Sequence, residues 1–268
     1  MSSIDVSGIR RLLRGGRLIP FVGAGLSAPL GLPSWSSLLD IIARQLGYEP
    51  EVYRSNGNAL QLAEYYVAAK GSIGPLRSEM DRLFDPSDDA IRGSRAHSML
   101  VDLRVPLIYT TNYDRILERA FELRNVNCHT IANIDDIGAA PPDATQIVKF
   151  HGTFSDDASL VLTESSYFER LEFESALDIK LRADTLGKSL LFLGYGLGDI
   201  NIRYLLYRLH KLRHPAARDG QRTPSAYLLA FGASEIQRTL LARWDVEVIE
   251  LDPIDKTAST AAFLESLL

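Results

Sequence analysis

The sequence has few of the features that mark metal-stabilised, secreted or membrane-spanning proteins. Its 268 residues include a single cysteine, Cys128, so an internal disulfide is excluded and a tetrahedral zinc site would need three other ligands. No uninterrupted apolar run is long enough for a membrane span or a secretory signal peptide. We therefore expect a cytoplasmic protein that carries no metal and does not enter a membrane.

Basic residues are also fewer than acidic residues. There are 29 lysines and arginines against 34 aspartates and glutamates, which gives a net charge of −5 at pH 7. A general nucleic-acid surface is normally basic, so we expect no direct sequence-specific binding of nucleic acid. With 46% hydrophobic and 24% charged residues, the composition is that of an ordinary soluble globular protein.

Short apolar runs alternate with helical patterns along the chain. The first run, 17–23, ends in Gly-Ala-Gly, and the segment after Pro33 has apolar residues at helical spacing up to Gly47. Such alternation favours an α/β fold with a Rossmann-like, doubly wound parallel sheet. The further strand-like runs are 105–109, 146–150, 190–193, 226–231 and 246–251, and helical stretches follow at 112–123 and 200–212.

The pattern changes between residues 48 and 104, where it is helical. Segments 59–70, 75–84 and 94–103 have helical spacing and are separated by turn-forming residues. No stretch of linker-like composition divides the chain. We therefore expect a single domain, 1–268, with a helical insertion at about 48–104.

Glycines follow the first predicted strand. In Gly23-Ala-Gly-Leu-Ser27 they would let the backbone approach a pyrophosphate and turn its N–H groups toward it. Alternatively, the glycines only relieve crowding between strand and helix. The third glycine of the dehydrogenase pattern is absent, because Ala28 stands at its position.

A polar segment, Tyr109-Thr-Thr-Asn-Tyr-Asp114, ends the next predicted strand. The carboxyl ends of strands are where ligands of open α/β sheets bind, so Asn112 is a candidate site residue. In the alternative interpretation, Thr111 or Asn112 is only a helix cap, and Asp114 is a first-turn residue that suits the helix dipole.

Two later strand ends have comparable features. His151 follows the run 146–150 and can relay a proton near neutral pH, although a lone histidine is more often structural. Gly194-Tyr-Gly-Leu-Gly-Asp199 follows the run 190–193, and its glycines indicate close backbone contact with a ligand or with another strand-end loop. Asp199 either binds a hydroxyl group or caps the next helix.

In their order along the chain, these four motifs resemble those of the sirtuins, and more closely those of the SIR2-like domains of bacterial antiphage defence systems. The matching segments lie between residues 19 and 204. They are Gly23–Ser27 with Gly31-Leu-Pro-Ser-Trp35, Thr111–Asp114, His151-Gly152 and Gly194–Asp199.

The resemblance implies a site for NAD. Asn112 would lie beside the nicotinamide ribose and position the attacking group, His151 would act as the general base through ribose hydroxyls, and Asp114 would contact the carboxamide. The other residues that the resemblance assigns to NAD binding are Gly23, Ala24, Gly25, Ser27, Thr111, Gly194 and Tyr195.

Two departures from the protein-deacylating sirtuins concern the acceptor. Those enzymes generally have a small zinc ribbon held by four cysteines, and Cys128 alone cannot supply these four ligands. Trp35 and Ser36 also replace the phenylalanine–arginine pair that follows Gly-Ile-Pro in deacylases. Both departures favour water as the acceptor.

The resemblance therefore predicts an NAD+ hydrolase that releases nicotinamide and ADP-ribose and depletes NAD in antiphage abortive infection. The sequence leaves open whether the ADP-ribose product is linear or cyclic. The alternatives are a non-catalytic module that senses NAD or ADP-ribose, and an NAD-dependent deacylase. The resemblance also implies a homo-oligomer, and an activity that depends on assembly or on a partner such as a HerA-type ATPase or an Argonaute-like protein.

Overall fold

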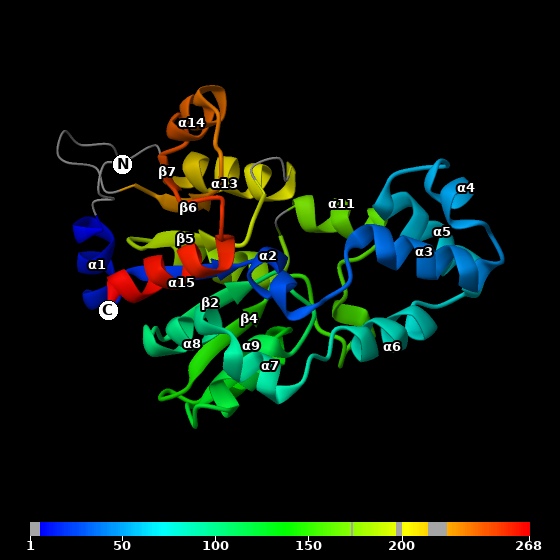
Figure 1. Cartoon of the computed structure of the whole chain (residues 1–268), viewed down its shortest axis with the longest axis horizontal. Helices are drawn as coiled ribbons and strands as arrows, with labels where there is room; N and C mark the ends of the chain where they lie inside the picture. Colours follow the sequence, from blue (N-terminus) through cyan, green and yellow to red (C-terminus); the bar gives the residue numbers. More distant parts are fainter. Residues whose placement is uncertain (1–5, 173, 197–199, 214–223) are drawn as a thin grey trace.

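The computed structural model describes residues 6–172, 174–196, 200–213 and 224–268, and it contains a seven-stranded parallel sheet (Figure 1). The strand order is β3-β4-β2-β1-β5-β6-β7, with β1 at the centre. This arrangement confirms the predicted Rossmann-like α/β fold. The strands are β1 (Leu18–Val22), β2 (Leu107–Thr110), β3 (Cys128–Ile131), β4 (Thr145–Lys149), β5 (Ser189–Leu193), β6 (Ala226–Ala230) and β7 (Val246–Glu250).

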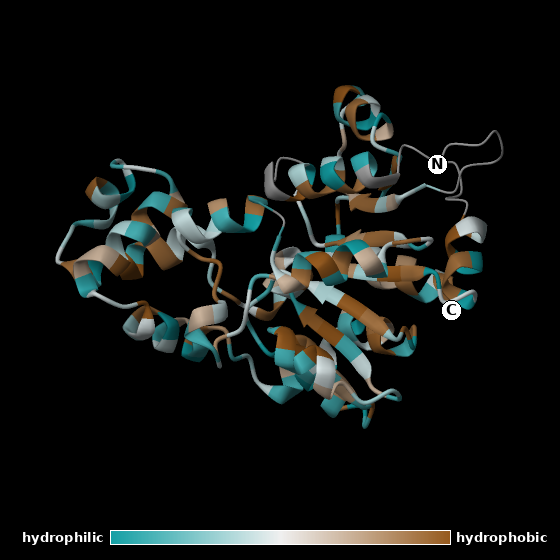
Figure 2. Cartoon of the chain, turned by 180° about the vertical axis from the view of Figure 1, so that it is seen from behind, coloured by the Kyte–Doolittle hydropathy of each residue, from teal (hydrophilic) through white to brown (hydrophobic). Residues whose placement is uncertain are grey.

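The sheet is covered by helices on both faces, because successive residues of each strand point to opposite sides. In β1, Leu18 and Val22 pack on one face, and Ile19 and Phe21 on the other. Figure 2 shows mainly apolar strands between helices that carry both hydrophobic and hydrophilic residues. The first face is covered by α1 (Ser7–Arg14), α7 (Asp88–Gly93), α8 (Arg95–Asp102), α9 (Ile116–Glu122) and α15 (Lys256–Leu267), and the second by α12 (Ala176–Asp184), α13 (Ile200–Arg213) and α14 (Glu235–Ala242).

A group of helices beside the sheet, here called the helical lobe, has a core of its own (Figure 1). It consists of α3 (Trp35–Leu46), α4 (Pro50–Arg54), α5 (Ala59–Lys70) and α6 (Gly74–Leu83). Tyr66 and Met80 are buried in it, together with Phe154 and Leu162 from the segment after β4. The segment 48–104 therefore contributes to two cores, since α7 and α8 pack on the sheet and not on the lobe.

Local signals explain where the lobe helices begin and end. The Ser34 hydroxyl accepts a hydrogen bond from the Ser37 N–H at the start of α3, and Gly47 ends that helix with a left-handed backbone at φ 80°. Asn58 and Gln61 form a capping box at the start of α5. These signals are legible in the sequence, and the helices predicted at 59–70, 75–84 and 94–103 appear within one residue of those limits.

Two details differ from the sequence prediction. β3 was not predicted, because it is a four-residue strand at the edge of the sheet with only Ile131 fully buried. α9 begins at Ile116 and not at Asn112, for a reason given below. Within the described ranges, no helix combines the length and the apolar character that crossing a membrane would need.

Candidate active site

The carboxyl ends of the central strands and the helical lobe enclose a pocket of about 420 Å³. All of the predicted site residues except Gly23 and Ser27 line it. Residues from β1, β2, β4 and β5 meet here because parallel strands end at the same edge of the sheet. The sheet contributes Ala24, Gly25, Thr111, Asn112, Asp114, His151, Gly194 and Tyr195, and the lobe side contributes Trp35, Leu38, Met80 and Phe84.

Asn112 lies in the loop after β2, where its backbone is fixed. Its N–H donates to the Thr110 hydroxyl over 3.0 Å, and that hydroxyl donates to the Val22 carbonyl over 2.8 Å. The side chain is 6% exposed, and its Nδ2 has no hydrogen-bond partner among the described residues. A buried amide without a partner is costly in a folded protein, and Asn112 lines the pocket, so a bound ligand is a candidate acceptor for this donor.

The alternative interpretation of Thr111 and Asn112 as helix caps is wrong. α9 begins at Ile116, with Arg115 at the N-cap position, and the Ile116 N–H donates to Asp114 Oδ1 over 3.0 Å. The alternative interpretation of Asp114, as an acidic residue at the start of the helix, agrees with this hydrogen bond from Ile116. Burial raises the pKa of Asp114, and the positive charge of Lys149 opposes that shift.

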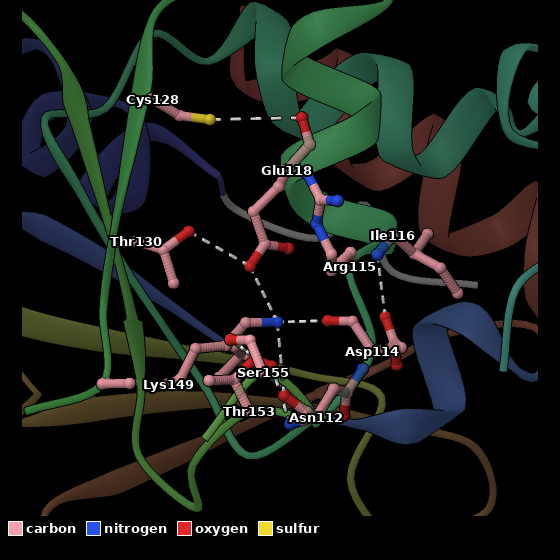
Figure 3. A network of polar contacts seen from close by, with 12 residues as sticks. Asn112, Asp114, Arg115, Ile116, Glu118, Cys128, Thr130, Lys149, Thr153 and Ser155 are labelled. Carbon is pink, nitrogen blue, oxygen red and sulfur yellow. Dashed lines mark hydrogen bonds and ion pairs between the residues drawn. The ribbon is translucent and has the colours of Figure 1, made fainter. Parts of the chain in front are cut away.

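A buried lysine explains why the residues before Ile116 are not helical (Figure 3). Lys149, at the end of β4, donates to the backbone carbonyl of Asp114 and lies 3.5 Å from the carbonyl of Asn112. Its Nζ also lies 2.9 Å from Glu118 Oε1. In a helix these carbonyls would accept hydrogen bonds from backbone N–H groups. Here the ammonium group of Lys149 is their donor instead.

His151 follows β4 and is 7% exposed, so its ring is shielded from water. The Tyr167 ring lies edge-on to it at 5.4 Å between centroids. Burial, and after it the positive charge of Arg170, lowers the pKa of His151 to about 3. The imidazole is therefore neutral at physiological pH.

The glycine loops after β1 and β5 pack directly against each other. The Gly25 N–H donates to the Gly194 carbonyl over 3.0 Å, and a Cβ on Gly25 would lie 2.7 Å from that oxygen. A Cβ on Gly23 would lie 2.7 Å from the Tyr195 ring. Close packing of two strand-end loops thus accounts for these glycines, and the Gly25 N–H is already engaged. Gly194 has a left-handed backbone at φ 74° that favours glycine.

Ser27 and Tyr195 are held by contacts within the protein. Ser27 is completely buried, and its Oγ lies 3.2 Å from Nε2 of His97 on α8. The Tyr195 hydroxyl donates to the Val22 carbonyl over 2.9 Å and lies 2.9 Å from Thr111 Oγ1. Asp199 lies outside the described residues.

Comparison with known proteins identifies the family. Residues 106–249, more than half of the chain, match the model of the SIR2-like domain. The chain belongs to the SIR2-like domain family. The resemblance inferred from its four motifs is thereby confirmed.

Other members of this SIR2-like group are longer proteins. The NAD(+) hydrolase ThsA of Enterococcus faecium is 30% identical over 189 residues, which are 69% of this chain and 38% of that protein. ThsA of Bacillus cereus (strain MSX-D12) is 30% identical over 196 residues, 70% of this chain and 39% of that protein. The defense-associated sirtuin 2 of Bacillus subtilis is 26% identical over 209 residues, 75% of this chain and 20% of that protein. The chain thus spans less than two thirds of the length of each of these relatives.

The SIR2-like pocket also contains residues that sequence reasoning missed. Tyr113 donates to the Val161 carbonyl over 2.7 Å, and Tyr167 covers His151 from α11 (Glu164–Glu172). Met80 and Phe84 come from the end of α6. Tyr113 lies within a recognised motif, but helical spacing cannot tell which apolar residues of α6 face a pocket and which face the lobe core.

The described part of the SIR2-like domain contains no group of three His, Cys, Asp or Glu residues close enough to hold a metal ion. Cys128 lies on β3, with its Sγ 4.0 Å from the Glu118 carbonyl. Burial raises the pKa of its thiol to about 11, so the thiol is uncharged at physiological pH.

Proposed function

We propose that this domain hydrolyses NAD at the bond between nicotinamide and ribose, releasing nicotinamide and ADP-ribose. The observation that carries the proposal is the convergence of Asn112, Asp114 and His151 in one pocket, where Asn112 Nδ2 has no hydrogen-bond partner among the described residues. The names of the ThsA relatives, which are NAD(+) hydrolases, support the choice of substrate. The pocket volume of about 420 Å³ suits a dinucleotide that extends partly into solvent.

The proposed chemistry matches the state of these side chains. Nicotinamide leaves as a neutral ring, so the C1′–N bond breaks toward an oxocarbenium-like ribose that the site must hold in place. The free Asn112 amide would orient the ribose and the attacking water. The neutral imidazole of His151 would accept the proton, directly or through a ribose hydroxyl.

The deciding experiment is a turnover assay with NAD that measures nicotinamide and ADP-ribose, with and without an acyl-lysine peptide. We expect stoichiometric release of both products and no acceleration by the peptide. Tight NAD binding without loss of NAD under any activating condition would identify a sensor. Peptide-dependent release of nicotinamide would identify a deacylase.

We propose also that the domain acts in the cytoplasm in antiphage defence, and that its activity depends on assembly into a homo-oligomer or on a partner. The named defence role of the Bacillus subtilis relative supports this setting, and unrestrained hydrolysis would empty the NAD pool of the host. Candidate partners are a HerA-type ATPase and an Argonaute-like protein. Measuring NAD turnover across protein concentrations tests the restraint, because a dilute monomer with full activity would contradict it.

A further inference from the structure

The buried ion pair beneath the Asn112 loop differs from the other salt bridges among the described residues. The side chains of Lys149 and Glu118 are 1% and 5% exposed, whereas every other pair has at least one partner more than a tenth exposed. Removing two charges from water costs stability that their attraction often fails to recover. The pair therefore calls for an explanation other than stability.

The contacts of the ammonium group provide that explanation. Its three N–H donors face three acceptors: Glu118 Oε1 at 2.9 Å, the Asn112 carbonyl at 3.5 Å and the Asp114 carbonyl (Figure 3). Two of these acceptors belong to the backbone of Asn112 and Asp114, whose polar side chains line the pocket. Glu118 is held in turn by the Thr130 hydroxyl, 3.3 Å from its Oε1.

Asn112 depends on such a backbone anchor. Its side-chain Nδ2 has no partner among the described residues, so no hydrogen bond from that donor orients the amide. The orientation is set by the main chain on either side, through the Thr110 hydroxyl at the Asn112 N–H and through Lys149 at the carbonyl. Lys149 also lies two residues before His151, so one strand end supports both proposed reacting groups.

We propose that Lys149 is a positioning residue for NAD hydrolysis, which clamps the carbonyls of Asn112 and Asp114 and thereby fixes the Asn112 amide in the pocket. Glu118 neutralises the clamp and joins it to α9. The inference rests on the proposed function for its kinetic consequence, but the clamp itself is a property of the loop and can be measured without turnover.

The test replaces the whole pair, in Lys149→Met/Glu118→Met, so that neither Lys149 nor Glu118 is left buried without the other. Apolar replacement of a buried pair is often neutral or stabilising, but the carbonyls of Asn112 and Asp114 lose their donor, so we expect an unfolding temperature close to that of the wild type. Displacing a reacting group by about 1 Å can cost about 10²-fold in rate. We therefore expect kcat to fall by about 10-fold to 10²-fold, while KM and the Kd for NAD change by less than about threefold.

A matched control removes a different salt bridge of the same helix. Arg119 on α9 pairs with Asp85 and Asp88, away from the pocket. Arg119→Met should leave kcat and KM unchanged. A loss of activity equal to that of the double variant would show that loosening α9 is enough, and the positioning role would be rejected.

Hydrogen exchange separates the clamp from the catalytic proposal. In the double variant, the amides of residues 111–116 should exchange faster than in the wild type, while those of β5 stay protected. If the wild type hydrolyses no NAD but the exchange result holds, the proposed function fails and the clamp stands. Wild-type kcat together with unchanged exchange would overturn the clamp.

A second variant covers the case in which the double variant does not fold. Lys149→Arg keeps the charge that Glu118 requires, but a planar guanidinium cannot reproduce the three directions of an ammonium group. We expect a folded protein with reduced kcat and faster exchange at residues 111–116. Wild-type values for both would reject Lys149 as a positioning residue.

Discussion

The pocket has two walls that differ in chemistry and in how they are held. The sheet wall is polar, and its loops are tied to neighbouring strands through backbone contacts such as those of Asn112 and Gly25. The lobe wall is largely apolar, and Leu38 and Met80 belong at the same time to the lobe core. On the sheet wall, therefore, a substitution changes chemistry without removing much packing, whereas on the lobe wall it changes stability first.

The two walls also differ in what holds their residues in place. Parallel strands bring residues that are far apart in sequence to one edge, and backbone hydrogen bonds hold them there. The lobe closes the pocket with side chains whose positions depend on packing alone. Four experiments test the contrast between the two walls.

The largest effect should come from the sheet wall. Asn112→Ala should lower kcat by about 10²-fold to 10⁴-fold with little loss of stability, because the side chain donates no bond from Nδ2 within the described protein. Steady-state kinetics and thermal unfolding measure the two quantities. Asn127→Ala, on an exposed segment outside the pocket, is the control and should change neither. Near-normal turnover in folded Asn112→Ala would remove Asn112 from the site.

On the lobe wall, Met80→Ala should cost about 2–5 kcal/mol of unfolding free energy, since Met80 is 1% exposed in the lobe core. We expect kcat to fall by less than about tenfold, because Met80 carries no group that reacts. Leu76→Ala removes an equally buried residue of α6 that does not line the pocket. If Met80→Ala lowers kcat as much as Asn112→Ala does, the two walls do not differ as we describe.

A smaller effect should appear on acidification, at α8 behind the sheet wall. Burial lowers the pKa of His97, which contacts Ser27 behind the glycine loop, to about 4. Stability from the neutral ring is complete above the unfolded pKa of about 6.5 and is lost as the pH falls toward 4, since only the unfolded chain takes up the proton. His97 should contribute a loss of about 2 kcal/mol between about pH 7 and 5.

Urea unfolding at the two pH values measures this loss. His97→Gln should be less stable than the wild type at pH 7, because it disturbs the contacts with Ser27 and Ser94, but its further loss on acidification should be smaller. Parallel pH dependence in the two proteins would mean that His97 takes up a proton in the folded state.

The smallest effect concerns His151 itself. Because its pKa is lowered to about 3, the imidazole stays neutral through weak acid. The profile of kcat/KM should therefore show no loss due to His151 between about pH 8 and about pH 5, over the range where the protein is folded. An acidic limb near pH 6.5 that disappears in His151→Gln would show that the ring is exposed to water in the free protein.

The sequence predicts the sheet and its polar rim well, for a physical reason. Buried parallel strands are short apolar runs, and the residues after them, such as His151, can be read directly. The edge strand β3 has too few buried residues to leave such a signal. The late start of α9 could not be predicted either, because it depends on Lys149, which is distant in sequence and looks like an ordinary surface residue.

The lining of the site divides in the same way. Motifs identify Asn112, Asp114 and His151, since their residue types and their order along the chain are distinctive. No local pattern identifies Tyr167 as the cover of His151, because that contact depends on where α11 packs. The engagement of Ser27 by His97 is equally nonlocal, and it assigns to a residue of the glycine motif a partner outside the pocket.

The positions of α1 and α15 bear on protein engineering. The two helices cover the same face of the sheet, and they meet at the end of the molecule away from the lobe, where the Arg10 side chain donates to the Ser266 carbonyl (Figure 1). A fluorescent tag or a second module attached after α15 would extend away from the pocket mouth. The same proximity suits circular permutation, in which a short linker joins α15 to α1 and new ends open in an exposed loop.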